Sequence, residues 1–242
     1  MALRLTLLNE FELEGDGRPI GLPAGAQRLV AFLALQDRPR SRVHIAGTLW
    51  PETSDGRAGG NLRSALCRLR TLGLRLVEAR QTHLALAADI SVDVHDLAVV
   101  ARAVLDVDDP ARAVRAGVLE LLDGELLPDW YDDWVLIERE RLRQLRLHAL
   151  ELLADRLTRA GRFAEALGSA LAALRGDLLR ESAHRQLIRT YLAEGNQVEA
   201  MRQYGLYRRL LADRLGLEPS PQMHELVRPL GAARGLATVT RP

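Results

Sequence analysis

The chain has 242 residues and a mass of 26.8 kDa, enough for one large domain or two of ordinary size. Hydrophobic residues make up 48% and charged residues 27%, a composition that excludes intrinsic disorder and collagen-like repeats. All 33 basic residues are arginine, and the lack of lysine excludes a Walker A phosphate loop and an enzyme that forms a Schiff base through lysine. The net charge of +1 excludes a protein that coats nucleic acid with a wholly basic surface.

Neither disulfides nor a targeting segment are expected. Cys67 is the only cysteine, so an internal disulfide framework and a cysteine-based zinc cluster are excluded. The start of the chain does not combine a basic segment with a long apolar run, and no stretch approaches the ~20 uninterrupted apolar residues of a transmembrane helix. The sequence therefore predicts a soluble, cytoplasmic protein without a membrane partner.

The first predicted elements are short strands. Apolar residues alternate with polar ones over 3–7 and again over 11–14, which is the period of a β-strand. The turn signal Gly15-Asp16-Gly17 follows, and a third short strand is predicted from Arg18 to Leu22. The glycines around this turn lie between strands, so we interpret the segment as a hairpin and not as a dinucleotide-binding loop.

Three helices and a hairpin are predicted next. Amphipathic patterns indicate helices over 24–36, 43–49 and 55–72, the second capped by Ser41. Alternation over 74–86 then predicts a β-hairpin whose polar tip is Arg80-Gln81-Thr82. Strands, three helices and a terminal hairpin are the layout of a winged helix, in which the third helix lies in the DNA major groove and the hairpin contacts the backbone or minor groove.

Arginine is concentrated on the third predicted helix and the hairpin. Residues 57–80 hold six arginines and a single acid, Glu78, whereas residues 81–134 hold three arginines and 12 acids. A short basic segment beside an acidic one indicates a local contact with a polyanion. The alternative, a solvated helix face with a chance cluster of charge, stays open.

Helical geometry sorts the residues of 55–72 into faces. The apolar residues Leu62, Leu66 and Leu69 share a narrow arc, which predicts the core side. Candidate base-contacting residues share another arc and have the chemistry that reads base edges: Arg57, Asn61, Ser64 and Arg68. Candidate DNA-backbone residues lie on the opposite flank of the helix and at the hairpin tip: Arg63, Arg70, Arg80, Gln81 and Thr82.

Two adjacent glycines, Gly59 and Gly60, do not suit a helix interior. Each costs about 1 kcal/mol there relative to alanine. Either the helix begins later than residue 55, or its backbone approaches another group closely.

The pattern after residue 90 is entirely helical. Helices are predicted over 94–105 and 110–122, and a long helix follows a tryptophan-containing segment near residue 130. Gly161-Arg162-Phe163 and Gly195-Asn196-Gln197 then recur with an offset of 34 residues, the period of tetratricopeptide (TPR) helix pairs. The predicted helices of this part are 146–160, 162–175, 179–194, 196–215 and a capping helix over 221–230. A plain helical bundle with accidental similarity stays the alternative.

Three segments carry a family resemblance: LWPETSDGRAGGNLRSALCRLRTLG, GELLPDWYDDWVLIERERLRQLRLHALELLADRL and RRLLADRLGLEPSPQMHEL. With the helical repeat, they resemble the Streptomyces antibiotic regulatory protein (SARP) family to about residue 230. Members of that family pair an OmpR-type winged helix with a TPR-like bacterial transcriptional activator domain. The resemblance implies an activator that binds tandem promoter repeats beside a second protomer and recruits RNA polymerase holoenzyme, often for a secondary-metabolite gene cluster.

The same resemblance assigns residues and domains. It implies groove contacts from Asn61, Ser64 and Arg68, and backbone contacts from Arg63 and Arg70. Many members carry polar or basic residues where Gly59 and Gly60 stand, so no contact is assigned there. The expected domains are a mixed α+β winged helix over 1–92, an all-α TPR-like activator domain over 93–230 and a flexible tail over 231–242.

No catalytic residue, metal or cofactor is expected. The six histidines show no metal-binding spacing, no ATPase module accompanies the two domains, and Cys67 has no evident base beside it. An enzyme is therefore not predicted. The remaining alternative is an interaction adaptor, in which the TPR-like half binds a peptide and the basic helix serves the fold alone.

Overall fold

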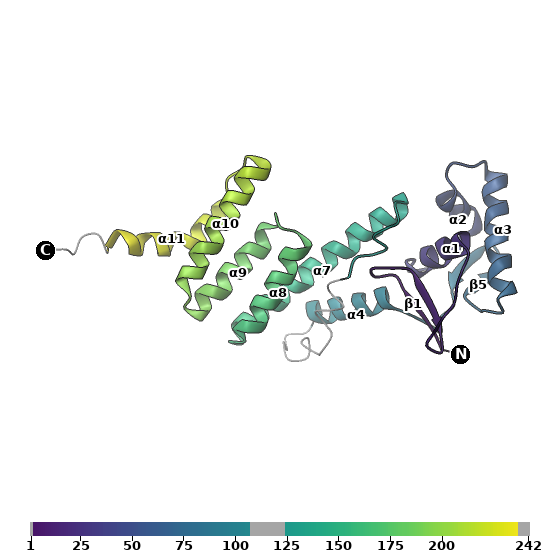
Figure 1. The fold of residues 1–242 in the computed structure, drawn as a ribbon, viewed down its shortest axis with the longest axis horizontal. Coiled ribbons are helices and arrows are strands. Elements are labelled where there is room, and N and C mark those ends of the chain that lie inside the picture. Colours follow the sequence, from purple (N-terminus) through teal and green to yellow (C-terminus); the bar gives the residue numbers. More distant parts are fainter. Residues whose placement is uncertain (1, 107–123, 237–242) are drawn as a thin grey trace. The chain divides into compact units, whose positions relative to one another are not determined.

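The computed structural model describes residues 2–106 and 124–236 (Figure 1). Contacts divide them into two compact units. We call residues 2–98 and 124–142 the N-terminal unit, and residues 99–106 and 143–236 the helical unit. The helix predicted over 110–122 lies outside the described residues, and the domain boundary predicted at residue 92 stays a prediction.

A four-stranded sheet opens the N-terminal unit. Its strands are β1 (Leu3–Thr6), β2 (Glu12–Gly15), β3 (Arg18–Pro19) and β7 (Ile90–Val92), in the order β3-β2-β1-β7. β1 pairs antiparallel with β2 and parallel with β7, so that Leu5 lies between Leu13 and Val92. β3 is shorter than predicted, and β7 was not predicted because three residues carry too little alternation to indicate a strand.

Three helices and a second sheet complete the predicted winged helix. The helices are α1 (Ala24–Ala34), α2 (Arg42–Leu49) and α3 (Asp55–Thr71), and α3 contacts both others (Figure 1). The sheet has the order β4-β6-β5, from β4 (Arg40–Ser41), β6 (His83–Leu86) and β5 (Val77–Arg80). The side chain of Ser41 accepts a hydrogen bond from the backbone N–H of His44 at 3.2 Å, which confirms the predicted cap. We call β5, β6 and their turn the wing.

Residues 124–142 pack onto this unit from far along the chain. The backbone N–H of Leu127 donates to the carbonyl of Leu7 at 2.9 Å. Trp130 stacks on Phe11, and Trp134 meets Phe32 edge to face with ring centroids 5.4 Å apart. The sequence marked these tryptophans but did not predict that they complete the core of the N-terminal unit.

Asp93 joins the end of β1 to the start of α4 (Asp93–Asp106). Its buried carboxylate accepts hydrogen bonds from the backbone N–H groups of Leu7, at 3.0 Å, and Leu8, at 2.9 Å. It also accepts from the N–H of Val94 at 2.7 Å. Burial raises the pKa of Asp93, while these hydrogen bonds act to lower it.

The helical unit is built from successive helices (Figure 1). They are α7 (Asp133–Arg159, which begins in the N-terminal unit), α8 (Phe163–Gly176), α9 (Glu181–Glu194), α10 (Gln197–Leu215) and α11 (Pro221–Leu236). α9 packs against α8 and α10, and α11 packs against α9 and α10. These helices match the predicted ones with two exceptions. The helix predicted over 146–160 is the second part of α7, which begins at Asp133, and α11 continues past Pro229 into the predicted tail.

The 34-residue repeat has a structural counterpart. Gly161 and Gly195 both adopt left-handed backbone conformations, with φ of 73° and 87°, where α7 and α9 end. Ala166 and Ala200, the equivalent positions on the following helices, are both fully buried. The predicted TPR-like architecture is therefore confirmed.

A buried histidine lies inside this unit. His184 is buried against the ring of Tyr207, its Nε2 hydrogen-bonds the carbonyl of Leu178 at 2.9 Å, and its Nδ1 lies 2.8 Å from Nε2 of Gln203. Burial lowers the pKa of His184, and burial together with Glu181 raises the pKa of Tyr207 to about 12.

Along residues 2–106 and 124–236, no helix is both long and apolar enough to cross a membrane.

Candidate nucleic-acid interface

α3 presents one apolar side to the core and one polar side to solvent. Ala58, Leu62, Ala65 and Leu69 are buried, as an amphipathic helix resting on α1 and α2 requires. The acidic residue Asp55 stands at its first turn, where a carboxylate complements the helix dipole. Every other charged residue of α3 is an arginine.

The four candidate base-contacting residues are exposed on that polar side: Arg57, Asn61, Ser64 and Arg68. Within the described part of the chain, none of their side chains has a hydrogen bond or an ion pair. Their donors and acceptors are therefore available to a partner. Contact with bases stays a prediction, but the exposure that it requires is present.

The candidate backbone residues divide between α3 and the wing. Arg63 and Arg70 are exposed and line a hollow of about 760 Å³ between α3 and β5, which we call the wing hollow. Arg80, Gln81 and Thr82 stand exposed at the wing tip, where Gln81 has a φ of 49° in the tight turn. Arg80 pairs at 3.5 Å with Glu78, a surface contact that leaves the arginine side chain 74% exposed.

One cation of this surface was missed by the sequence analysis. Arg42, the first residue of α2, lines the wing hollow beside Arg63 and Arg70. It reaches this place because β4 pairs with β6 and the N–H of Arg42 donates to the carbonyl of Thr82 at 2.9 Å. A two-residue strand shows no periodicity, so no signal in the sequence could have found this contact.

Gly59 and Gly60 lie inside α3, which begins at Asp55 as predicted, so the alternative in which the helix begins later is excluded. A Cβ added at Gly59 or Gly60 would meet only the guanidinium of Arg63, at 3.6 and 3.7 Å, which are ordinary contact distances. The alternative of a close approach therefore finds no neighbour among the described residues that needs a glycine at either position.

The structure leaves the arginines of α3 without acidic partners. In the ranges that it describes, Arg57, Arg63, Arg68 and Arg70 form no ion pair, whereas Arg180 and Arg185 of the helical unit do. Exposed cations without internal partners keep their full interaction with an external anion. The polar side of α3 is thus an exposed cationic surface.

Comparisons with known proteins agree with this architecture. A family model described as the bacterial transcriptional activator domain matches residues 89–230. The regulatory protein AfsR of Streptomyces coelicolor is 30% identical over 235 residues, which are 93% of this chain and 24% of that protein. The regulatory protein AfsR of Streptomyces griseus is 29% identical with the same coverage. The chain thus spans about a quarter of the length of these curated relatives.

A solved structure shares the fold. Mycobacterium tuberculosis EmbR, in complex with a low-affinity phosphopeptide, superposes with a TM-score of 0.75 and 22% sequence identity. The match covers 93% of this chain and 64% of that one. The combination of a winged helix with a TPR-like helical part therefore occurs in a solved structure, and the likeness concerns the fold alone.

Proposed function

Because this chain belongs to the Streptomyces antibiotic regulatory protein family, a family of transcriptional regulators, we propose that it is a transcriptional activator. In this proposal it binds double-stranded promoter DNA sequence-specifically through α3 and the wing. Its targets in this proposal are tandem promoter repeats of a secondary-metabolite gene cluster. Its further partners are RNA polymerase holoenzyme and a second protomer on the adjacent repeat.

The single observation that carries the proposal is the exposed, unpaired cationic side of α3. Phosphate neutralisation by arginine supplies the sequence-independent part of DNA affinity, because it releases counterions condensed on the duplex. Arginine and asparagine also pair with guanine and adenine edges in the major groove. In the proposed complex Arg57, Asn61, Ser64 and Arg68 read bases, whereas Arg63, Arg70 and the wing tip Arg80-Gln81-Thr82 hold the backbone.

Arg68→Ala and Arg63→Ala are expected to weaken DNA binding in different ways. Loss of a bidentate base contact at Arg68 costs about 1–3 kcal/mol on the cognate site and relaxes the preference at one base pair. Loss of a phosphate contact at Arg63 weakens all sequences similarly and flattens the salt dependence. Fluorescence anisotropy with cognate and scrambled duplexes measures both, and identical behaviour of the two variants would refute these separate roles.

DNA is expected to shield Cys67 from alkylation. This only cysteine of the chain is exposed on α3 and lines the wing hollow, so a duplex seated on α3 would cover it. The rate of maleimide modification should drop severalfold when promoter DNA is added. As a control, a Glu10→Cys, Cys67→Ser variant places the thiol in the exposed link between β1 and β2, where the rate should not change. Equal rates for Cys67 with and without bound DNA would contradict the proposed face.

Protection mapping tests the arrangement on the promoter. Two protected half-sites in the same orientation, about one helical turn apart, are expected for tandem binding by two protomers. Inverted half-sites would instead indicate a two-fold dimer. Failure of the unchanged protein to bind any duplex at low salt would favour the interaction adaptor and reject the DNA-binding function.

A further inference from the structure

The charged residues that line the wing hollow are all cationic. Its charged residues are Arg42, Arg63 and Arg70, and no acidic side chain is among the residues that line it. None of these three guanidinium groups has a hydrogen bond or ion pair within residues 2–106 and 124–236. Three like charges around one solvent-filled space repel one another, so an anion bound among them lowers the electrostatic energy.

Building on the proposed function, we propose that Arg42 is a DNA-backbone residue, which holds one phosphodiester strand of the duplex in the wing hollow together with Arg63 and Arg70. The three residues come from two helices, α2 and α3. The wall opposite α3 is formed by Val77 and Ala79 of the wing and by Leu74, which precedes β5. The strand thus passes between α3 and the wing, and Arg42 contacts it from the start of α2.

The backbone at Arg42 is held in place before any DNA arrives. Its N–H donates to the carbonyl of Thr82 at 2.9 Å, and the preceding residue, Ser41, pairs with His83 across the β4–β6 ladder. The side chain is half-buried, unlike the exposed side chains of Arg63 and Arg70. Less conformational entropy is therefore lost when Arg42 contacts a phosphate than when a free surface arginine does.

Arg42 also lines a second groove, but the charged residues around that groove favour a bound anion less than those around the wing hollow. This groove, of about 330 Å³, lies between α2 and α3 and is lined by Arg42 and Arg63 together with the acidic Asp55. Asp55 repels a phosphate there, whereas the wing hollow has Arg70 as a third cation and no acid. The wing hollow is thus the better phosphate site of the two.

The test is the salt dependence of DNA binding by the full chain. Arg42→Ala is expected to weaken binding of cognate and scrambled duplexes by the same factor. It should also lower the slope of log affinity against log salt by about 0.9, the value for one lost phosphate contact. Arg42→Lys keeps the charge and should keep the slope. Arg18→Ala removes an equally unpaired arginine from β3, on the other sheet, and should change neither quantity.

Several outcomes would overturn the assignment. A slope and affinity for Arg42→Ala equal to those of the unchanged protein would show that Arg42 does not contact a phosphate. A loss confined to the cognate duplex would make Arg42 a base-reading residue. Unaltered tryptophan fluorescence of the variant verifies that the N-terminal unit is folded, since all three tryptophans of the chain, Trp50, Trp130 and Trp134, lie there. If the unchanged protein itself bound no DNA, the proposed function would fail, and this assignment with it.

Discussion

Asp93→Ala is expected to lower the free energy of unfolding of the N-terminal unit by about 3 kcal/mol, because it leaves buried backbone donors without an acceptor. The carboxylate accepts from the N–H groups of Leu7, Leu8 and Val94 at 2.7 to 3.0 Å. Among the described residues, no other acceptor bonds the N–H groups of Leu7 and Leu8. Asp93→Asn keeps one acceptor oxygen at the same place and should lose less.

Urea unfolding followed by tryptophan fluorescence measures this effect, because the tryptophans report the N-terminal unit alone. Asp89→Ala, four residues earlier, removes an exposed carboxylate that forms no hydrogen bond with the residues described here, and its free energy of unfolding should stay within about 0.5 kcal/mol of that of the unchanged protein. A midpoint for Asp93→Ala that matches this control would mean that the three hydrogen bonds add nothing to stability.

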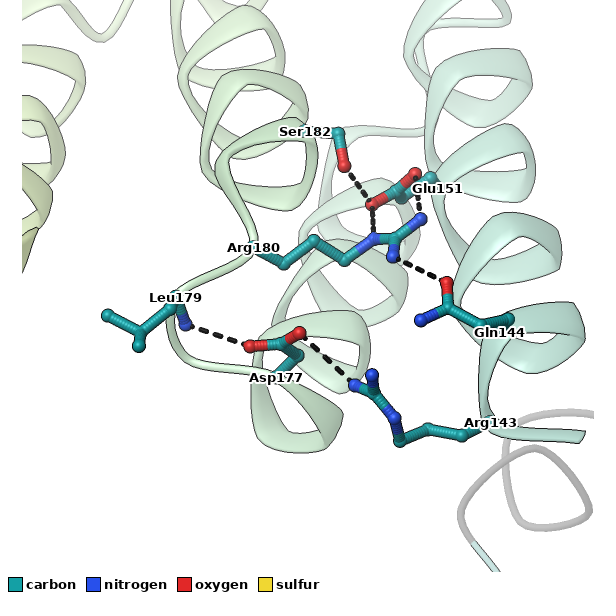
Figure 2. A network of polar contacts seen from close by, with 7 residues as sticks. All are labelled: Arg143, Gln144, Glu151, Asp177, Leu179, Arg180 and Ser182. Carbon is teal, nitrogen blue, oxygen red and sulfur yellow. Dashed lines mark hydrogen bonds and ion pairs between the residues drawn. The ribbon is translucent and has the colours of Figure 1, made fainter. Parts of the chain in front are cut away.

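Arg180→Ala is expected to destabilise the helical unit by a similar amount, about 3 kcal/mol, because it leaves a largely buried carboxylate unpaired. Arg180 Nε lies 2.5 Å from Oε1 of Glu151, and the two side chains are only 15% and 16% exposed. Figure 2 shows the pair bridging the α8–α9 connection and α7, with Gln144 and Ser182 as further partners. In the same network, Arg143 of α7 bonds Asp177 at 3.1 Å.

Two further variants distinguish the effect of the Arg180–Glu151 ion pair from the effect of side-chain packing around it. The double variant Arg180→Met, Glu151→Leu buries apolar side chains of similar size and should cost clearly less than Arg180→Ala, since no charge is stranded. Arg159→Ala breaks an exposed pair with Asp155 on the same helix, where the arginine is 75% exposed, and should cost well under 1 kcal/mol. Far-ultraviolet circular dichroism during thermal unfolding measures all three. Equal losses of stability for Arg180→Ala and Arg159→Ala would contradict the argument that burial makes the Arg180–Glu151 pair the more important one.

Much of the architecture could be predicted from local patterns. The apolar spacing on 55–72 located α3 and its exposed side, since residues three and four apart share a face of any α-helix. The 34-residue offset located Gly161 and Gly195, because a left-handed helix end favours glycine wherever it occurs. Arg57, Asn61, Ser64 and Arg68 were likewise found from geometry internal to one helix, and the structure leaves all four exposed.

Contacts between distant segments were decided by the tertiary structure. Arg28 pairs with Asp132 over 104 residues of chain, and Trp134 packs against Phe32 of α1, so the N-terminal unit takes part of its core from residues 124–142. Arg42 likewise joins the wing hollow only through its bond to Thr82. The physical reason is that helix and strand periods depend on neighbours within one or two turns, whereas these contacts depend on how whole elements pack, which no local spacing encodes.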